Sequence, residues 1–494
     1  MAKAAVVIGA GFGGLAAAIR LRARGYPVVV LEGMDQPGGR AAVFRQDGFT
    51  FDAGPTVITA PYLLHELFSL VGRDSRDYFE LVPVDPFYRI EFPDGTHFDY
   101  VGDEERLLAQ IEQFNPADVD GYRRLARLSE RIFDIGYTQL SDVPFSRVWD
   151  MLRIAPTMLR LGNHRSVYAE VSRHIKDERL RQVFTFQPLL VGGNPFRVTS
   201  IYLLIHWLER KWGVHFAMGG TTSIVHGMTR LLEDIGVEVR LGTPVERIEV
   251  HDRRAAAVWT GDRERIPAEL VVANADPTQV YGTLIAPGDR GRWKDLMLQT
   301  RQFSMGLFVG YFGTRKTYPE LAHHTIILGP RYRELLTDIF DRKVLAEDFS
   351  LYLHAPTRTD PALAPPGHEG FYVLSPVPNT LSGIDWEQTG PVYFDRILDH
   401  LDATYLPGLR ENLVTQFHVT PNYFRDTLRS THGAGFGIEP RLSQSAFFRF
   451  HNQSPDFANL YFVGASTHPG AGVPGVLSTA KVLDRIVPAP GAAA

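Results

Sequence analysis

The stretch "VVIGAGFGGLAAAIR", from Val6 to Arg20, decides the fold of this chain. It starts with a β-branched run that is typical of a buried parallel strand, and the sequence from Leu15 to Arg24 favours a helix. Between them, Gly9, Gly11 and Gly14 have the G-x-G-x-x-G spacing, which lets a pyrophosphate approach the backbone at the N-terminus of a helix. We therefore expect a strand, a glycine turn and a helix that together bind a dinucleotide.

An export signal and a membrane span are the alternative interpretations of this stretch. Lys3 and the alanines around it imitate the basic start and the small residues of a signal peptide. The apolar run is short for a membrane span, and its glycines weaken a continuous helix. Because the sequence that follows continues a nucleotide-binding pattern, we expect neither a signal peptide nor a transmembrane helix.

A second buried strand, from Val28 to Leu31, is followed by Glu32, which lies 18 residues after Gly14. In the dinucleotide-binding fold an acidic residue at about this distance accepts hydrogen bonds from the ribose hydroxyls. The two strands and the acid therefore support the dinucleotide site much more strongly than the glycine spacing alone.

The next element, "DQPGGR" from Asp35 to Arg40, bears on the identity of the dinucleotide. Gly39 and Arg40 can wrap the pyrophosphate from its other side, because arginine supplies a fixed charge and several donors. An ordinary turn with a solvated arginine is the other interpretation. With this element the chain resembles the FAD-binding amine oxidase and carotenoid desaturase superfamily, and the resemblance implies FAD rather than NAD.

Length and composition fit a large flavoenzyme of about three domains. The 51 basic and 56 acidic residues give a net charge of −5, without the excess of Lys and Arg that a nucleic-acid-binding surface needs. The absence of cysteine excludes disulfides, iron–sulfur clusters, thiolate metal sites and a cysteinyl flavin. We expect no nucleic-acid partner and no metal site, so redox chemistry must come from the cofactor.

Further along the chain, the pattern predicts more pieces of the same nucleotide-binding sheet. The segment Thr221 to Asp234 has helical periodicity, and it is followed by two short strands, Val237 to Leu241 and Val245 to Val250. A further buried strand runs from Leu270 to Ala273. By the resemblance, Val245 lies where the superfamily places backbone against adenine.

The C-terminal segment "NLYFVGASTHPGAGVPGV", from Asn459 to Val476, reads as a strand, a glycine-rich turn and the start of a helix. Many FAD enzymes have Asp after the first glycine of this segment, where it binds the ribitol, whereas this chain has Ala465. Backbone amides or Thr467 must then hold that part of the cofactor. An irregular loop is the alternative. The residues expected to contact FAD here are Gly464, Thr467, Gly472 and Val473.

The parts between these segments should form the substrate site. The stretch from Phe87 to Tyr100 alternates around Asp94-Gly95 and predicts a β-hairpin. The fold class is therefore α/β: a Rossmann-like FAD-binding domain built from separated segments, a substrate domain with a mixed β-sheet, and a helical cap or membrane-facing insert. We assign residues 1–75, 217–290 and 451–494 to the FAD domain, 76–102 and 291–450 to the substrate domain, and 103–216 to the insert.

Over nearly its whole length the chain resembles the bacterial-type phytoene desaturases. The motifs that carry the resemblance are "GFTFDAGPTVIT", "IEQFNPADVDGY", "LLVGGNPFRVTSIY", "GGTTSIVHGM", "HHTIILGPRYRELL", "DFSLYLHAPTRTDP" and the C-terminal segment. The resemblance implies successive desaturation of 15-cis-phytoene, an apolar C40 carotene, to lycopene or intermediate products. It also implies peripheral attachment to the cytoplasmic side of the cell membrane. Quinone or oxygen is a possible electron acceptor.

This chemistry needs a hydride acceptor, which flavin can supply, while a proton leaves the neighbouring carbon. A hydrocarbon offers no charge or hydrogen bond, so its site should be a long apolar channel. By the resemblance, the stretch "DAGPTV" from Asp52 to Val57, with Gly54, Pro55 and Thr56, lies near the flavin ring. A plain loop in which the aspartate caps a helix is the alternative.

The sequence does not identify a catalytic base. The candidates in family-like motifs are His323, His324, Arg331, Tyr332 and His354, and a structural role is the alternative for each. Other flavin chemistry remains open, namely a carotene cis–trans isomerase or an amine oxidase. A non-catalytic, lipid-binding escort protein is a further alternative, which the intact flavin elements argue against.

The segment from Phe145 to Arg165 combines apolar residues with arginines, as membrane-surface elements do. We expect it to meet the membrane, or else to form an amphipathic cap over the substrate channel. Pro156 is expected to divide it into two short helices.

Overall fold

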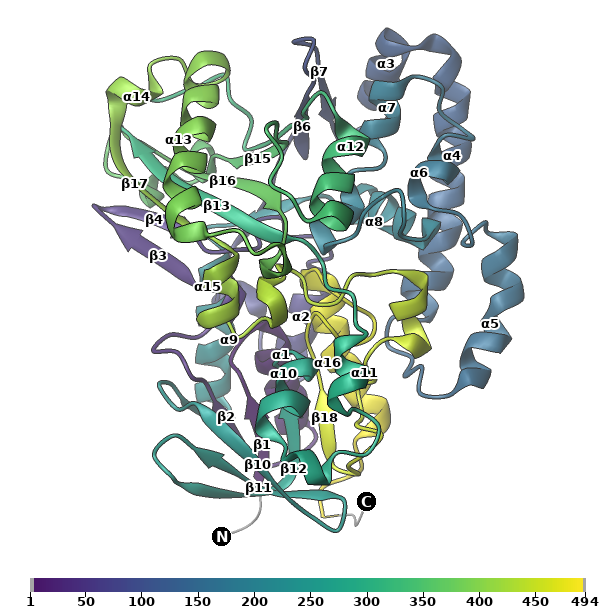
Figure 1. The fold of residues 1–494 in the computed structure, drawn as a ribbon, viewed down its shortest axis with the longest axis vertical. Helices are drawn as coiled ribbons and strands as arrows, with labels where there is room; N and C mark the ends of the chain where they lie inside the picture. Colours follow the sequence, from purple (N-terminus) through teal and green to yellow (C-terminus); the bar gives the residue numbers. More distant parts are fainter. Residues whose placement is uncertain (1–3, 492–494) are drawn as a thin grey trace.

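The strand before the glycine turn lies between two parallel neighbours inside a largely parallel sheet in the computed structural model, which describes residues 4–491 (Figure 1). Strand β1 (Ala4–Ile8) leads through the glycine turn into helix α1 (Phe12–Ala23), and β2 (Val28–Leu31) returns beside β1 in parallel register. The predicted strand–turn–helix–strand unit is confirmed. Helix α1 starts earlier than predicted, because the glycines already belong to its first turn.

Strands from distant parts of the chain complete this sheet, in the order β10–β11–β12–β1–β2–β9, with β18 also paired to β12. The strands β1, β2, β9 and β18 all run parallel within it, whereas β10, β11 and β12 form an antiparallel meander. The additional strands are β9 (Glu238–Arg240), β10 (Val245–His251), β11 (Arg254–Thr260), β12 (Arg265–Ala273) and β18 (Leu460–Phe462). The α/β fold assembled from separated segments is therefore confirmed.

Both faces of this sheet are covered, which explains why its strands are continuously apolar. Ala5 and Val7 of β1 belong to a buried cluster with the helices α1, α9 (Thr221–Asp234) and α16 (Val473–Ile486). Val6 and Ile8 point to the opposite face and belong to a second buried cluster. Side chains of successive strand residues alternate between faces, so one short strand supports both layers.

A second, mixed sheet lies at the other end of the molecule, in the order β17–β13–β16–β15–β14–β6–β7 (Figure 1). Its β6 and β7 form the predicted hairpin, and β14 pairs with β6 in parallel. Helix α13 (Trp386–Thr404) packs against one face, and the other face looks towards the interior. The strands are β6 (Tyr88–Glu91), β7 (His97–Tyr100), β13 (Gly306–Thr314), β14 (His324–Ile327), β15 (Leu351–His354), β16 (Glu369–Val377) and β17 (Leu413–Val419).

Two small strand pairs and several short helices connect these layers. The pairs are β3 (Val43–Gln46) with β4 (Phe49–Asp52), and β5 (Leu81–Pro83) with β8 (His215–Ala217). The connecting helices are α2 (Tyr62–Ser69), α10 (Pro277–Gln279), α11 (Asp295–Gln299), α12 (Tyr332–Thr337), α14 (Leu409–Asn412) and α15 (Pro421–Asp426).

Helices fill the segment between the two strands β7 and β8 and lie on one side of the molecule (Figure 1). They are α3 (Glu104–Phe114), α4 (Val119–Phe133), α5 (Val148–Arg160), α6 (Val167–Val171), α7 (Glu178–Val183) and α8 (Leu204–Trp212). The limits drawn for the three domains from the sequence stay a prediction.

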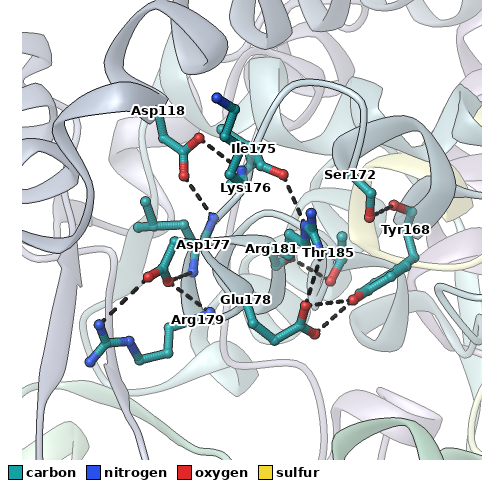
Figure 2. Close-up of polar contacts among 11 residues, drawn as sticks. Asp118, Tyr168, Ser172, Ile175, Lys176, Asp177, Glu178, Arg179, Arg181 and Thr185 are labelled. Atoms are coloured by element: carbon teal, nitrogen blue, oxygen red, sulfur yellow. Dashed lines mark hydrogen bonds and ion pairs between the residues drawn. The ribbon is translucent and has the colours of Figure 1, made fainter.

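The buried carboxylate of Asp118 anchors this helical segment (Figure 2). Its two oxygens accept hydrogen bonds from the backbone N–H groups of Lys176 and Asp177, each at 2.8 Å. Asp177 in turn caps the start of α7 by accepting from the N–H of Arg179 at 2.9 Å. Through these bonds, the start of α4 fixes the position of α7.

The prediction that Pro156 splits its segment is wrong, because α5 continues through this proline. A proline inside a helix leaves the carbonyl four residues earlier without its partner. That residue is Leu152, which is 54% exposed, and Pro156 is exposed as well. We infer that water replaces the missing donor at this surface. No helix among residues 4–491 combines the length and apolar character that crossing a membrane requires.

Candidate functional site

The carboxyl ends of four strands meet at one edge of the parallel sheet. The register pairs Ile8 of β1 with Leu31 of β2 and with Ala273 of β12, and Ala273 with Phe462 of β18. The residues that follow these strands therefore emerge side by side. In open α/β sheets this edge is where ligands bind.

The glycine turn at this edge leaves no room for side chains. A β-carbon on Gly14 would lie 1.9 Å from the carbonyl oxygen of Gly9, and one on Gly11 would lie 2.9 Å from Nδ2 of Asn274. No side chain caps the start of α1. Its first N–H groups and the positive end of the helix dipole are therefore available to an anion such as a pyrophosphate.

Glu32 is nearly buried beside this turn and is held in place by the backbone. Its Oε2 accepts from the N–H of Ala10 at 2.6 Å, and its Oε1 accepts from the N–H of Met34 at 3.0 Å. A carboxylate has about four lone-pair sites, so the side chain can still accept hydrogen bonds from two ribose hydroxyls.

The turn containing Gly39 and Arg40 lies against the first glycine turn. The N–H of Gly38 donates to the carbonyl of Ala10 at 2.9 Å, and Gly38 forms a parallel bridge with Gly11. Burial lowers the pKa of Arg40, and its Nη2 donates to Oγ of Ser430 at 3.0 Å. An arginine stays charged even so, and this half-buried one supplies a cation beside the two turns.

One cavity of about 1150 Å³ joins these elements to an apolar chamber, and this volume exceeds that of ordinary small-ligand pockets. The cavity is lined by most of the residues that the sequence predicted to bind the cofactor. They are Gly9, Gly11, Glu32, Gly39, Arg40, Gly54, Pro55, Thr56, Val245, Gly464, Gly472 and Val473. Its apolar wall includes Phe186, Leu189, Leu190, Ile326, Leu328, Tyr332, Leu335, Leu336, Tyr372 and Leu374. The structure thus brings most of the predicted residues to one continuous space.

Two of the predicted residues, Gly14 and Thr467, do not line the cavity. Gly14 allows the close contact between α1 and the turn. Thr467 is fully buried, and its hydroxyl donates to the carbonyl of Gly464 at 2.8 Å. The hydroxyl closes the turn and does not face the cavity, whose wall at this point is formed by Gly464 and Ala465.

The segment "DAGPTV" fits both interpretations that the sequence left open: part of it lines the cavity, and its aspartate caps a helix. Gly54, Pro55 and Thr56 line the cavity, and a β-carbon on Gly54 would lie 2.1 Å from the carbonyl oxygen of Arg40. Asp52 instead accepts from the N–H of Thr221 at 2.8 Å, at the start of α9. Burial raises the pKa of Asp52 to about 7.

Glu209, in the wall of the cavity, is a residue that the sequence analysis missed. Its Oε1 accepts from the hydroxyl of Tyr88 at 2.8 Å, and Oε2 is buried without a partner among residues 4–491. Burial raises the pKa of this carboxyl to about 8. In the sequence it stands before Arg210 and Lys211, so it reads as part of a solvated helix face. Here it can bind or release a proton near neutral pH.

Of the candidate bases named from the sequence, only Tyr332 lines the cavity. Arg331 forms ion pairs with Asp338, at 3.1 Å, and with Asp348. His323, His324 and His354 are buried together behind the wall.

The segment containing α5 also reaches the cavity, through Phe145, Ile154 and Met158. Its outer surface is apolar as well, since Trp149 is 72% exposed and Leu159 is 59% exposed. The three arginines at 147, 153 and 160 are exposed, whereas Arg165 is bound to Glu170 at 2.8 Å. The segment therefore covers the cavity and presents an apolar, basic surface outwards.

Comparisons with known proteins show the family and the fold of this chain. A family described as flavin containing amine oxidoreductase matches residues 12–481. A phytoene desaturase (lycopene-forming) of Pseudescherichia vulneris is 53% identical over 97% of this chain and 98% of its own length. One of Pantoea ananas, with the same description, is 51% identical with the same coverage. An oxidoreductase from Methanosarcina mazei has a TM-score of 0.64 at 18% identity, covering 97% of this chain and 99% of its own, which shows a shared fold.

We expect Glu32→Ala to weaken FAD binding by about 1.5–3 kcal/mol, because charge-assisted hydrogen bonds to the ribose are lost. Titration of the apoprotein with FAD by calorimetry measures this change. Glu238→Ala is the matched control, since Glu238 is exposed on the neighbouring strand β9 and pairs with Arg240. Equal affinity of the Glu32 variant and the parent would show that this acid does not hold the ribose.

Glu209→Gln should change how stability depends on pH. The folded protein keeps the Glu209 proton up to about pH 8, whereas the unfolded chain loses it near the ordinary value of 4.5. Stability of the parent therefore falls as pH rises between these values, by up to about 1.4 kcal/mol per unit, and then levels off. Because the amide of the Glu209→Gln variant cannot ionise, the variant should not lose this stability as the pH rises.

Thermal unfolding of the parent and of Glu209→Gln from pH 5 to pH 9 tests whether the stability of the parent falls with rising pH. The advantage of Glu209→Gln should grow up to about pH 8, whereas Glu104→Gln, at an exposed position, should follow the parent. Parallel curves for parent and Glu209→Gln would contradict the raised pKa.

Proposed function

This chain belongs to the flavin containing amine oxidoreductase family, and we propose that it is an FAD-dependent phytoene desaturase of carotenoid biosynthesis. In this proposal it converts 15-cis-phytoene to lycopene by successive dehydrogenation. The observation that carries the proposal is the cavity of about 1150 Å³ that joins the glycine turns to an apolar chamber. Relatives more than half identical over nearly their whole length, described as lycopene-forming phytoene desaturases, support the same substrate.

The residues around the glycine turns fit FAD. A turn that a β-carbon would fill, an uncapped helix start, a fixed carboxylate and a half-buried arginine offer partners for the pyrophosphate and the ribose. We assign the pyrophosphate to Gly9, Gly11, Gly39 and Arg40, the ribose to Glu32, and the adenine to the backbone at Val245. FAD bound there supplies the acceptor for the hydride that leaves the substrate.

The chamber beyond this site suits a hydrocarbon. Leu189, Leu335 and Leu374 offer apolar surface, so they bind and orient a polyene by shape and exclude water. Of the polar groups in the wall, Glu209 has a carboxyl that can exchange a proton near neutral pH. Its deprotonated form, whose fraction grows as the pH approaches 8, is our candidate acceptor for the proton that leaves the carbon next to the hydride donor.

The enzyme would meet its substrate at the cytoplasmic surface of the membrane, through α5. The exposed side chains of Trp149, Leu152 and Leu159 can enter the acyl boundary, and the arginines can bind anionic headgroups. Because Ile154 and Met158 on the same helix line the cavity, a carotene could pass from the bilayer to the chamber beneath α5. Quinone or oxygen would then reoxidise the cofactor.

Anaerobic mixing of the FAD-loaded protein with phytoene in liposomes tests the reaction. We expect the flavin absorbance to bleach while the polyene spectrum moves to longer wavelength. The reason is that forming a double bond moves a hydride from the carotene to the flavin. Chromatography of the products after reoxidation should end in lycopene. A change of cis–trans geometry with unchanged flavin would favour an isomerase, and oxidation of an amine without reaction on phytoene would favour an amine oxidase.

Changing Arg147, Arg153 and Arg160 to Glu tests the membrane surface. Each arginine near an anionic surface contributes about 1 kcal/mol, so the triple variant should sediment far less with anionic liposomes. The matched control reverses the same number of exposed arginines elsewhere, at Arg45, Arg73 and Arg263. If the α5 variant stays folded and sediments like the control, the membrane contact lies on another surface.

A further inference from the structure

Three histidines gather behind the wall of the cavity, in the second sheet. His324 begins β14, His323 precedes it, and His354 ends β15. The antiparallel register places His324 directly opposite His354, so both side chains point to the same face of the sheet. Their rings are stacked with centroids 5.2 Å apart, and the ring of His323 lies 4.9 Å from that of His354. We call these three residues the histidine cluster.

The outer ring nitrogens of two members are held by hydroxyl groups. Nδ1 of His323 contacts Oγ1 of Thr359 at 2.6 Å, and Nδ1 of His324 contacts the hydroxyl of Tyr352 at 2.7 Å. Metal-binding histidines characteristically have such a partner on the nitrogen that does not bind the metal, because it fixes the tautomer and the ring orientation. The cluster therefore has the outer contacts of a metal site.

The inner ring nitrogens face one another. One ring nitrogen from each histidine lies within 4.8 Å of those from the other two. Nε2 of His323 and Nε2 of His354 are 3.0 Å apart, close to the separation of about 3.4 Å between two nitrogens on a tetrahedral zinc ion. Binding an ion would bring the third nitrogen, from His324, to a similar separation from the other two, all three now lying within 4.8 Å of one another.

Hydrogen bonding within the protein satisfies His323, through Thr359 and Nε2 of His354, but not the whole cluster. A neutral imidazole has one donor and one acceptor, yet the inner Nε2 of His324 has no partner among residues 4–491, and neither has the outer Nδ1 of His354. All three side chains are buried, and burial lowers the pKa of each ring, so each presents a neutral nitrogen lone pair. Unpaired polar atoms in such a place are costly unless a ligand or water binds them.

We propose that His323, His324 and His354 bind one divalent transition-metal ion, with zinc as the best match. Imidazole nitrogens without thiolate or carboxylate favour the borderline metals, and zinc takes three histidines with water in a fourth position. The ion links β14 to β15. Through His324 it also fixes Tyr352, which lines the cavity and whose hydroxyl contacts Oγ1 of Thr56 at 2.6 Å. It is a structural ion that supports the chamber wall.

The experiment uses the full-length, untagged protein loaded with FAD and dialysed after expression with added zinc. Elemental analysis should find about one zinc per chain. Removal of the metal by dipicolinate should lower the melting temperature, and added zinc should restore it. Cobalt substituted for zinc should give the visible bands of a tetrahedral nitrogen site.

His354→Ala should lose the metal and the cobalt bands, whereas His400→Ala, a half-buried histidine outside the cluster, should keep both. His354→Gln gives the same comparison if the alanine variant does not fold. A parent protein with less than about a tenth of an equivalent of metal, and a melting temperature unaffected by zinc or chelator, would overturn the proposal. So would equal metal content in the parent and the folded His354 variants. Either result would make the cluster a hydrogen-bonded group bridged by water.

Discussion

A β-carbon on Gly14 would lie 1.9 Å from the carbonyl oxygen of Gly9, so the chain can pass from β1 into α1 only with glycine at this position. This close backbone contact sets the place of the helix start, and the parallel register then brings Glu32, Asn274 and Gly464 to the same edge. The site is therefore formed by strands that are far apart in the sequence but whose carboxyl ends lie side by side at one edge of the sheet.

The low polarity of the cavity wall is the second condition on which the site depends. The cavity leads from a charged, hydrogen-bonding end into a wall of leucines, isoleucines and aromatic rings. In that wall the pKa of Glu209 rises to about 8, because its charged form loses water and has no cation beside it. The surroundings that suit a hydrocarbon thus also prepare a carboxyl for proton exchange near neutral pH.

Local sequence patterns were sufficient for the glycine turn, the hairpin from β6 to β7 and helix α9, since each depends on neighbouring residues. The pattern could not show that Thr467 closes its own turn, or that Asp52 caps α9 while Gly54 lines the cavity. The role of Glu209 and the grouping of the three histidines could not be predicted, because their environment comes from β6, β14 and β15, which only tertiary pairing brings together. The predicted break at Pro156 was wrong, because water at the exposed surface can replace the backbone hydrogen bond that the proline cannot donate.

The most direct test of the account is a crystal structure of the protein with both FAD and phytoene bound. We predict the ribose at Glu32, the pyrophosphate at the turns of Gly9 and Gly39, and the hydrocarbon along the wall formed by Leu335 and Leu374, with its end at the flavin ring. FAD and phytoene bound in separate cavities, or phytoene outside this apolar wall, would contradict the claim that one continuous space joins the cofactor to its substrate.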